Sequence, residues 1–218
     1  MVSIRSLYDL SHTMAGEYLG AFQYPWEALG GIKGLILKLG ESLGEDYRQL
    51  APQVWVHETA VIAPTAYLGA PCIIGPGTEV RHCAFIRGSA LVGGNCVVGN
   101  SVELKNVILF DNVQVPHYNY VGDSILGYKS HMGAGSLTSN VKSDKTLVVV
   151  KDGGEAIPTG LKKFGAMLGD YVEVGCNSVL NPGTVIGPNC SIYPTSCVRG
   201  VVPANSIWKT GGVIVKKV

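Results

Sequence analysis

Residues 56–97 read in blocks of six as VHETAV, IAPTAY, LGAPCI, IGPGTE, VRHCAF, IRGSAL and VGGNCV. Each block begins with a large aliphatic residue and has a small residue or threonine in fifth place. The aliphatic series runs on through Val98 and Leu104 to Phe110. A repeat this regular predicts one short strand per hexad, with the aliphatic side chain inside and the small one at a corner. No hexad can bury its own apolar face, so each coil must be stabilised by stacking on the next.

A second series resumes near the C-terminus, and a short stretch in a shifted register lies between the two. The later series begins at Leu168 and ends at Val198, and the short stretch contains Leu126 and Met132. From 139 to 166 the repeat stops, and the segment is polar and rich in lysine. We therefore expect an all-β solenoid over residues 51–218, with an inserted loop at about 139–166.

Residues 1–50 lie outside the hexad pattern. Their apolar residues are spaced by three and four, which indicates one face of a helix; they are Trp26, Leu29, Ile32, Ile36, Leu39 and Leu43. Pro25 suits a first helical turn, and a shorter helix is expected between Tyr8 and Phe22. We expect this helical segment to cap or flank the open end of the solenoid, with binding of a partner as the alternative.

Composition excludes several classes of protein. The net charge of +1 gives no reason to expect a nucleic acid or an anionic membrane as partner. No apolar run is long enough to span a bilayer, and the N-terminus lacks the pattern of a signal peptide. The six cysteines have no metal-ligand spacing, which favours reduced thiols in a cytoplasmic protein. Cys72, Cys96 and Cys190 fall in small-residue positions and are expected to be packing thiols.

Two cations are spaced by one full coil. Arg87 and Lys105 each follow a core aliphatic residue and should stack on one wall, roughly 4.8 Å apart. Without salt-bridge partners they would repel each other, which favours an anion between them; two solvated surface charges are the alternative. His117 lies two hexads beyond Lys105 and belongs to a different wall. It could meet the cations of another chain, which suggests a site between subunits.

The stretch from about 87 to 200 resembles a specific family. The matching segments are Val102-Glu103-Leu104-Lys105, His117-Tyr118-Asn119-Tyr120-Val121-Gly122-Asp123, Met132-Gly133-Ala134-Gly135 and Asn140. They resemble the acetyltransferase domain of bacterial bifunctional enzymes that acetylate glucosamine-1-phosphate and then uridylylate it. They are also similar to the C-terminal domain of archaeal sugar-phosphate nucleotidylyltransferases, and Tyr24-Pro25-Trp26-Glu27 resembles the linker in those proteins. The resemblance implies a left-handed β-helix with three hexads per coil and a homotrimer.

The resemblance also implies roles for individual residues. His117 would be the general base, and Asn140 would contact the amino sugar near the reacting amine. Arg87, Lys105 and Tyr120 would hold the sugar phosphate, while His131 replaces an asparagine that touches the sugar. The acetyl-CoA site would comprise Ala134, Cys176 and Pro194 along the path of the cosubstrate, with Lys142, Lys145 and Arg199 at its phosphates. An attacking amine must lose a proton, and an imidazole that titrates near neutrality can take it; no metal is required.

The sequence therefore predicts an acetyl-CoA-dependent N-acetyltransferase. Its acceptor would be an amino-sugar phosphate such as glucosamine-1-phosphate or galactosamine-1-phosphate, on the route to UDP-N-acetylglucosamine. No glycine-rich nucleotide loop is present, so nucleotidyl transfer is not predicted. The main alternative is a non-catalytic regulatory or scaffold β-helix that partners a separate sugar-phosphate nucleotidylyltransferase.

Two further readings stay open. Acyl transfer to another small-molecule amine or hydroxyl is one. A zinc enzyme of the hexapeptide class, similar to the γ-type carbonic anhydrases and using His82, His117 and His131, is the other. It is disfavoured because that family pairs two of its ligands five residues apart, and the residue five after His117 is Gly122.

Overall fold

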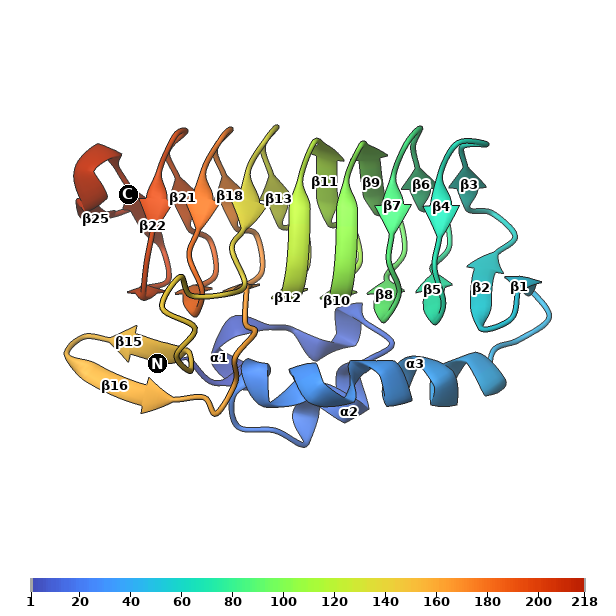
Figure 1. Cartoon of the computed structure of the whole chain (residues 1–218), viewed down its shortest axis with the longest axis horizontal. Coiled ribbons are helices and arrows are strands. Elements are labelled where there is room, and N and C mark those ends of the chain that lie inside the picture. The colour runs from blue at the N-terminus through green and yellow to red at the C-terminus, as the bar shows by residue number, and fades with distance from the viewer. Residues whose placement is uncertain (1, 218) are drawn as a thin grey trace.

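The computed structural model describes residues 2–217 and folds into a solenoid of stacked coils (Figure 1). In the regular coils, paired residues lie eighteen apart, so that Val56 pairs with Ile74 and Ile74 pairs with Val92. The strands of successive coils are parallel and form long sheets. The prediction of an all-β, left-handed β-helix with a short N-terminal helical segment is confirmed.

The coils have three walls, numbered here in chain order. Wall 1 consists of β2 (Val54–His57), β5 (Cys72–Ile74), β8 (Ala90–Val92), the second halves of β10 (Glu103–Leu109) and β12 (Tyr120–Leu126), β17 (Ala166–Leu168), β20 (Thr184–Ile186) and β23 (Val201–Val202). Wall 2 consists of β3 (Val61–Ile62), β6 (Glu79–Val80), β9 (Val97–Asn100), β11 (Gln114–His117), β13 (His131–Met132), β18 (Glu173–Val174), β21 (Ser191–Ile192) and β24 (Ser206–Trp208). Wall 3 consists of β4 (Tyr67–Leu68), β7 (Phe85–Ile86), the first halves of β10 and β12, β14 (Leu137–Thr138), β19 (Val179–Leu180) and β22 (Cys197–Val198).

Two antiparallel strands close the ends of the sheets. β1 (Tyr47–Ala51) pairs with β2 at the N-terminal end, so the chain already forms a strand before residue 50. β25 (Ile214–Lys216) pairs with β24 at the other end, after a 3₁₀ turn at Thr210–Gly212.

The small-residue positions are packed inside the coils as expected. Cys72, Cys96 and Cys190 are buried, and all six cysteines are free. Burial raises the pKa of the Cys72 and Cys96 thiols to about 12. Since the thiolate is the reactive form of cysteine, these two groups are inert packing residues.

The aliphatic series does not end at Phe110 as the sequence suggested. Leu109, rather than Phe110, pairs with Val92, and Leu109 in turn pairs with Leu126. The step from Leu104 to Leu109 is five residues instead of six, because β10 runs straight through the corner between walls 3 and 1. Phe110 is buried, but its ring packs on Tyr8 of the N-terminal segment, with ring centroids 5.1 Å apart.

This slip of one residue places Pro116 outside the core series. Val115 pairs with Val98 in its stead, and β11 continues through Pro116 to His117. Gly99 lies opposite Pro116, and a Cβ there would be 1.6 Å from the proline carbonyl oxygen. The backbone of residue 116 can therefore approach this closely because Gly99 has no side chain.

The N-terminal segment lies along wall 1 and does not cap the open end of the solenoid (Figure 1). Its elements are α1 (Ile4–Leu7), the 3₁₀ helix η1 (Leu10–His12), α2 (Gly16–Gly20), the 3₁₀ helix η2 (Pro25–Gly31) and α3 (Ile32–Glu41). α3 contacts β5, β8 and β10. The N-terminal segment packs there because the outward face of wall 1 is apolar. Without this cover Ile73, Leu91 and Ile108 would be exposed, and they are instead fully buried.

The inserted segment covers the rest of wall 1. The chain leaves the solenoid after β14 of wall 3 and rejoins it at β17 of wall 1. Between these strands, β15 (Val149–Asp152) and β16 (Glu155–Pro158) form an antiparallel hairpin. β15 contacts β23 of wall 1, and the hairpin lies beside the N-terminal segment (Figure 1). Walls 2 and 3 therefore carry the faces that the chain leaves uncovered. No helix within residues 2–217 has the length and apolar character to cross a membrane.

We predict that the inward side chains determine stability. Ile86→Ala removes a fully buried side chain and should lower the free energy of unfolding by about 2–5 kcal/mol. Val61→Ala is the control, because Val61 is 64% exposed and its truncation should change stability by less than about 0.5 kcal/mol. Urea denaturation of both variants measures the difference, and equal effects would contradict the inward orientation of Ile86.

Candidate functional site

The predicted site residues gather at the two edges of wall 3. His117, Ala134 and Cys176 lie by the corner between walls 2 and 3, where they line one cleft with His131. Arg87, Lys105 and Asn140 lie by the corner between walls 3 and 1. Tyr120 begins the wall 3 part of β12 and joins this second group through a hydrogen bond to Asn140.

His117 is exposed at the end of β11 and borders a cleft of about 510 Å³ on wall 2. Its backbone is fixed on both sides: its N–H donates to Asn119 Oδ1 at 3.1 Å, and its carbonyl accepts from the Gly135 N–H at 3.0 Å. Asn119 is itself buried and donates to the carbonyls of Gly133 and Ser136. The imidazole has no hydrogen bond or ion pair with any other residue between 2 and 217, so both of its ring nitrogens are unpartnered there.

His131 lies in the same cleft but is already paired. Its Nδ1 is 2.8 Å from Glu173 Oε2, on the neighbouring strand of wall 2. The carboxylate holds the imidazole ring in one orientation, so His131 is suited to positioning a ligand in the cleft.

Each of the two stacked cations has a salt-bridge partner, so the condition under which they would repel each other is not met. Arg87 Nη1 is 2.7 Å from Glu103 Oε1, and Lys105 Nζ is 2.9 and 3.0 Å from the two oxygens of Asp123. The hydrogen bond from Arg87 to Glu103 raises the pKa of the guanidinium. This first pair is solvent-exposed, and exposed pairs contribute little stability, so an incoming anion can compete for Arg87.

Asp123 is the centre of the second pair and was missed as a site residue. It is 4% exposed and accepts hydrogen bonds from Lys105, from Asn106 Nδ2 at 3.0 Å and from Asn140 Nδ2 at 2.6 Å. Its backbone is left-handed, with φ of 49°, at the corner where β12 runs straight through. The signal in the sequence was its spacing of eighteen residues from Lys105, which places the carboxylate one coil away.

Asn140 and Tyr120 extend this network toward solvent. The Asn140 amide donates to Asp123 and, at 3.2 Å, to the Tyr120 hydroxyl. Asn140 donates both hydrogen bonds through Nδ2. Its side-chain oxygen, Oδ1, is therefore the acceptor that a ligand can reach. Desolvation, and then the charges of Asp123 and Glu103, raise the pKa of Tyr120. The hydroxyl therefore stays protonated and can donate.

The residues assigned to the cosubstrate divide between the two edges. Ala134 and Cys176 border the His117 cleft, and Pro194 packs on Gly175 next to Cys176. Lys142 and Arg199 line a second pocket of about 410 Å³ at the other edge of wall 3. Lys145 lines neither cavity.

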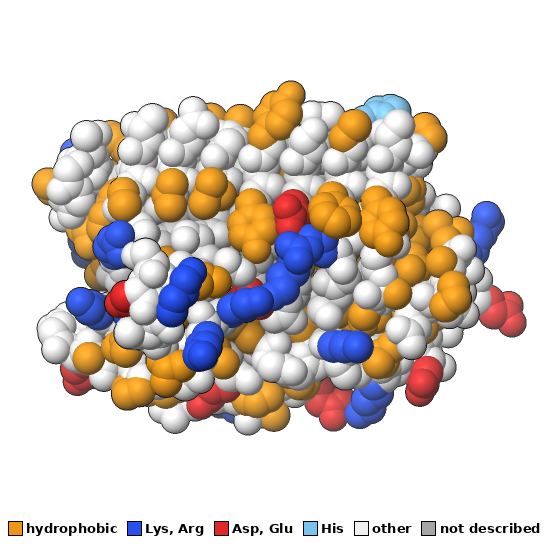
Figure 2. Space-filling model, viewed as in Figure 1, with side chains coloured by type: hydrophobic (Ala, Val, Ile, Leu, Met, Phe, Trp, Pro, Cys, Tyr) orange, Lys and Arg blue, Asp and Glu red, His pale blue; other side chains and the backbone are white. Residues whose placement is uncertain are grey.

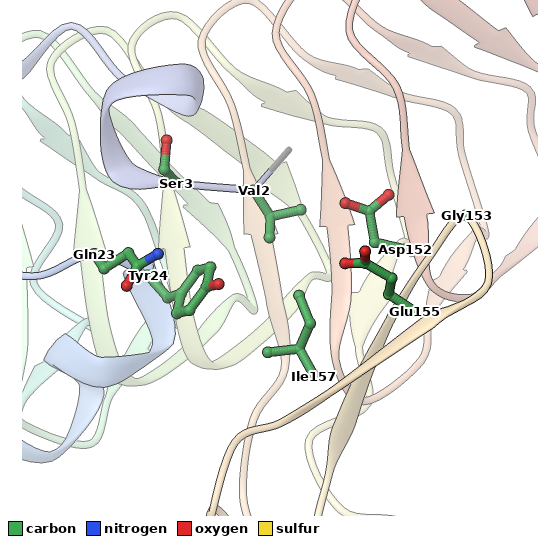
Figure 3. Close-up of a pocket in the computed structure, with 8 residues that line it drawn as sticks. All are labelled: Val2, Ser3, Gln23, Tyr24, Asp152, Gly153, Glu155 and Ile157. Atoms are coloured by element: carbon green, nitrogen blue, oxygen red, sulfur yellow. The ribbon is translucent and has the colours of Figure 1, made fainter.

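Another pocket and another histidine lie outside this site. A pocket of about 490 Å³ lies between the N-terminal segment and the hairpin, and Figure 3 shows Asp152 and Glu155 on one side of it and Gln23 and Tyr24 on the other. It contains no basic residue and none of the predicted site residues. Within residues 2–217 no three His, Cys, Asp or Glu side chains converge as a metal-ligand set. His82 lies apart from the cleft and bonds Thr65.

The spacing of the strands and their coil-on-coil stacking show that the chain is built from hexapeptide repeats. The model of a family described as the GMPPB C-terminal domain matches residues 71–154 of this hexapeptide-repeat chain.

Several relatives with known names are similar to this hexapeptide-repeat chain. The bifunctional sugar-1-phosphate nucleotidylyltransferase/acetyltransferase of Sulfurisphaera tokodaii is 31% identical over 189 residues, which cover 85% of this chain and 47% of the relative. The bifunctional protein GlmU of Methanococcus maripaludis is 30% identical over 205 residues, which cover 92% of this chain and 49% of the relative. Among solved structures, the acetyltransferase domain of PglB from Neisseria gonorrhoeae gives a TM-score of 0.36 at 15% identity, over 80% of this chain and 63% of that one. The chain spans about half the length of the curated relatives it matches.

We predict that Asp123 holds the network together. Asp123→Asn removes the charge opposite Lys105 and places an amide where the carboxylate accepts hydrogen bonds, which should destabilise the fold by about 1–3 kcal/mol. Glu103→Gln is the matched control, since its pair with Arg87 is exposed and should contribute about 1 kcal/mol or less. Thermal or urea unfolding compares them, and a smaller loss for Asp123→Asn than for Glu103→Gln would contradict the assignment.

Proposed function

We propose that the chain is an acetyl-CoA-dependent N-acetyltransferase that acts on an amino-sugar phosphate, with glucosamine-1-phosphate and galactosamine-1-phosphate as the first candidates. The observation that carries this proposal is the unpartnered imidazole of His117, fixed by its backbone at the mouth of a cleft. The printed name of the Sulfurisphaera relative joins acetyl transfer to sugar-1-phosphate chemistry, which supports this class of acceptor. In a pathway, the product would serve the synthesis of UDP-N-acetylglucosamine.

In the proposed reaction, the amine of the sugar attacks the thioester carbonyl of acetyl-CoA. The new C–N bond forms as His117 accepts a proton from the nitrogen, and the C–S bond then breaks to release the thiol of CoA, which recovers the proton. Asn140 Oδ1 of a second copy of the chain, in the homotrimer proposed below, accepts a hydrogen bond from the amine and orients it. A general base of this kind contributes about 10²–10⁴-fold to the rate.

The acceptor phosphate binds at the stacked cations. Arg87 exchanges its exposed contact with Glu103 for a charge-assisted contact with the phosphate. Lys105 keeps its bond to Asp123, so it acts as a fixed positive charge beside the phosphate, and the protonated Tyr120 donates a further hydrogen bond. Anchoring the phosphate fixes the position of the amine relative to the thioester, and such positioning can supply a large part of the rate enhancement.

We further propose a homotrimer in the cytoplasm with the site between subunits. Wall 1 is covered, whereas the outward column of wall 3 is largely apolar and uncovered: Tyr67 is 61% and Phe85 43% exposed. Figure 2 shows a row of hydrophobic side chains across this face. Packing of the part of wall 3 that carries Tyr67 and Phe85 against a second copy would bury these two rings and bring His117 of one chain toward the cations of the next. Six free cysteines favour a reducing compartment.

One observation favours a second candidate function. Both cations already have a carboxylate partner, as expected of a non-catalytic β-helix that partners a separate nucleotidylyltransferase chain. In that case the Arg87 and Lys105 pairs are structural, and His117 is an exposed residue without a role in catalysis.

A thiol-release assay with acetyl-CoA and a panel of amino-sugar phosphates tests the two candidates. We expect turnover by the wild type and a loss of about 10²–10⁴-fold in His117→Ala. His82→Ala is the matched control, because His82 is exposed at the equivalent position two coils earlier; it should retain full activity. Absence of CoA release with every acceptor would favour the scaffold function. Equal activity of the wild type and His117→Ala would show that His117 is not the general base.

A further inference from the structure

The pocket of about 410 Å³ at the second edge of wall 3 is built partly by the inserted segment. The residues that line it include Ser139 and Lys142 at the start of the insertion, Lys151 of β15, and Asn181 and Arg199 of the solenoid. We call it the hairpin pocket. The chain segments that meet here are far apart in the sequence, so the pocket exists only because the insertion folds back onto the corner between walls 3 and 1.

The strand β15 presents Lys151 to this pocket by simple alternation. Val148 and Val150 are fully buried, whereas Val149 and Lys151 are exposed and line the pocket. Successive side chains of a strand point to opposite faces. Burial of the two valines therefore fixes the direction of the Lys151 side chain.

Two glycines let β15 lie directly on the corner. Gly183 has φ of 81°, and a Cβ there would be 2.7 Å from Val148 Cγ1. Gly200 has φ of 74°, and a Cβ there would be 3.0 Å from the Lys151 carbonyl oxygen. The backbone of Lys151 thus packs against the residue that follows Arg199, and the two cations are held at one cavity.

The charges of the pocket are only partly balanced. Lys142 Nζ is 3.2 Å from Asp144 Oδ2, but the side chains of Lys151 and Arg199 form no ion pair or hydrogen bond with any part of the chain that the structure describes. Figure 2 shows lysine and arginine side chains gathered below the hydrophobic row of this face. Two unpaired cations at one cavity repel each other, and an anion between them removes that repulsion.

We propose that Lys151 and Arg199 bind the ribose 3′-phosphate of acetyl-CoA, with Lys151 as the residue that selects for it; this rests on the proposed function. A 3′-phosphate is a terminal monoester with a charge near −2, so it can enter a pocket, whereas the diphosphate is bonded on both sides. The thioester end would lie at Ala134 and Cys176, across wall 3. About five residues separate the two edges, roughly 16 Å along a strand.

The surface between the two edges suits the arm of the cosubstrate. Leu137, Val179 and Cys197 form the outward column of wall 3 there and are partly exposed. An extended, weakly polar arm can cross this column from one edge of wall 3 to the other, with its charged end in the hairpin pocket. The acceptor phosphate is the other possible source of an anion, and the experiment separates the two.

Calorimetric titration of the full chain with CoA and with 3′-dephospho-CoA tests the assignment. We expect the wild type to prefer CoA by about tenfold or more, the range of one charged hydrogen bond. Lys151→Ala should lose most of this preference, and Lys151→Arg should keep it. Lys33→Ala, which removes an exposed lysine on α3, is the charge control and should bind as the wild type does.

Three outcomes would overturn the proposal. One is a preference for CoA that Lys151→Ala leaves unchanged. Another is a Lys151→Ala variant that binds both forms of CoA normally but has a raised KM for the amino-sugar phosphate, which would assign the pocket to the acceptor. The third is a wild type that binds inorganic pyrophosphate through Lys151 but binds no CoA, in which case the proposed function fails while an anion pocket remains. Normal CoA binding without turnover would leave the pocket assignment standing and remove only the catalytic role.

Discussion

Burial of one aliphatic residue per hexad is the constraint on which the molecule depends. A strand of two or three residues is too short to be stable alone, so each coil holds its shape only between its neighbours. The result is a stiff scaffold in which outward side chains of adjacent coils are one strand spacing apart. Side chains that would be mobile on a loop are thereby held in columns, as with Arg87 next to Lys105 and His131 next to Glu173.

The outward surface of wall 1 extends this constraint beyond the coils. Aliphatic residues point both inward and outward there, so the wall needs a second cover on its outer side. The N-terminal segment and the hairpin supply that cover, and their own apolar residues join one core with the solenoid. The faces of the solenoid that stay open to solvent are consequently those of walls 2 and 3.

The polar network forms where the coil is irregular. β10 and β12 cross the corner between walls 3 and 1 with one residue fewer than the other coils, and Asn106 and Asp123 lie at this corner with positive φ. The same corner holds Lys105 and Asn140, and the insertion departs from it. Departures from a regular pattern are expected at functional sites, and here one deletion and one insertion fall at the same edge.

The hexad spacing was sufficient to predict the solenoid, the insertion and the placement of His117 on a different wall from the cations. It could not locate the one-residue slip, because Leu109 and Phe110 are both apolar and either could continue the series. It did not reveal the partners of Arg87 and Lys105, since Glu103 and Asp123 come close only once the coils are stacked. The alternation of β15 was hidden as well, because Val148, Val149 and Val150 have the same side chain and differ only in burial.

The direct stacking of Leu126 on Leu168 has a consequence for how this architecture can diversify. These residues are paired across the whole insertion, so the coils on either side join as though the intervening chain were absent. The insertion is thus an exchangeable module: its length and ligand preference can change while the scaffold keeps its register. A replacement must preserve only two features. It needs two aliphatic side chains that shield the outer surface of wall 1 from water, and a backbone that can pack closely against the two corner glycines.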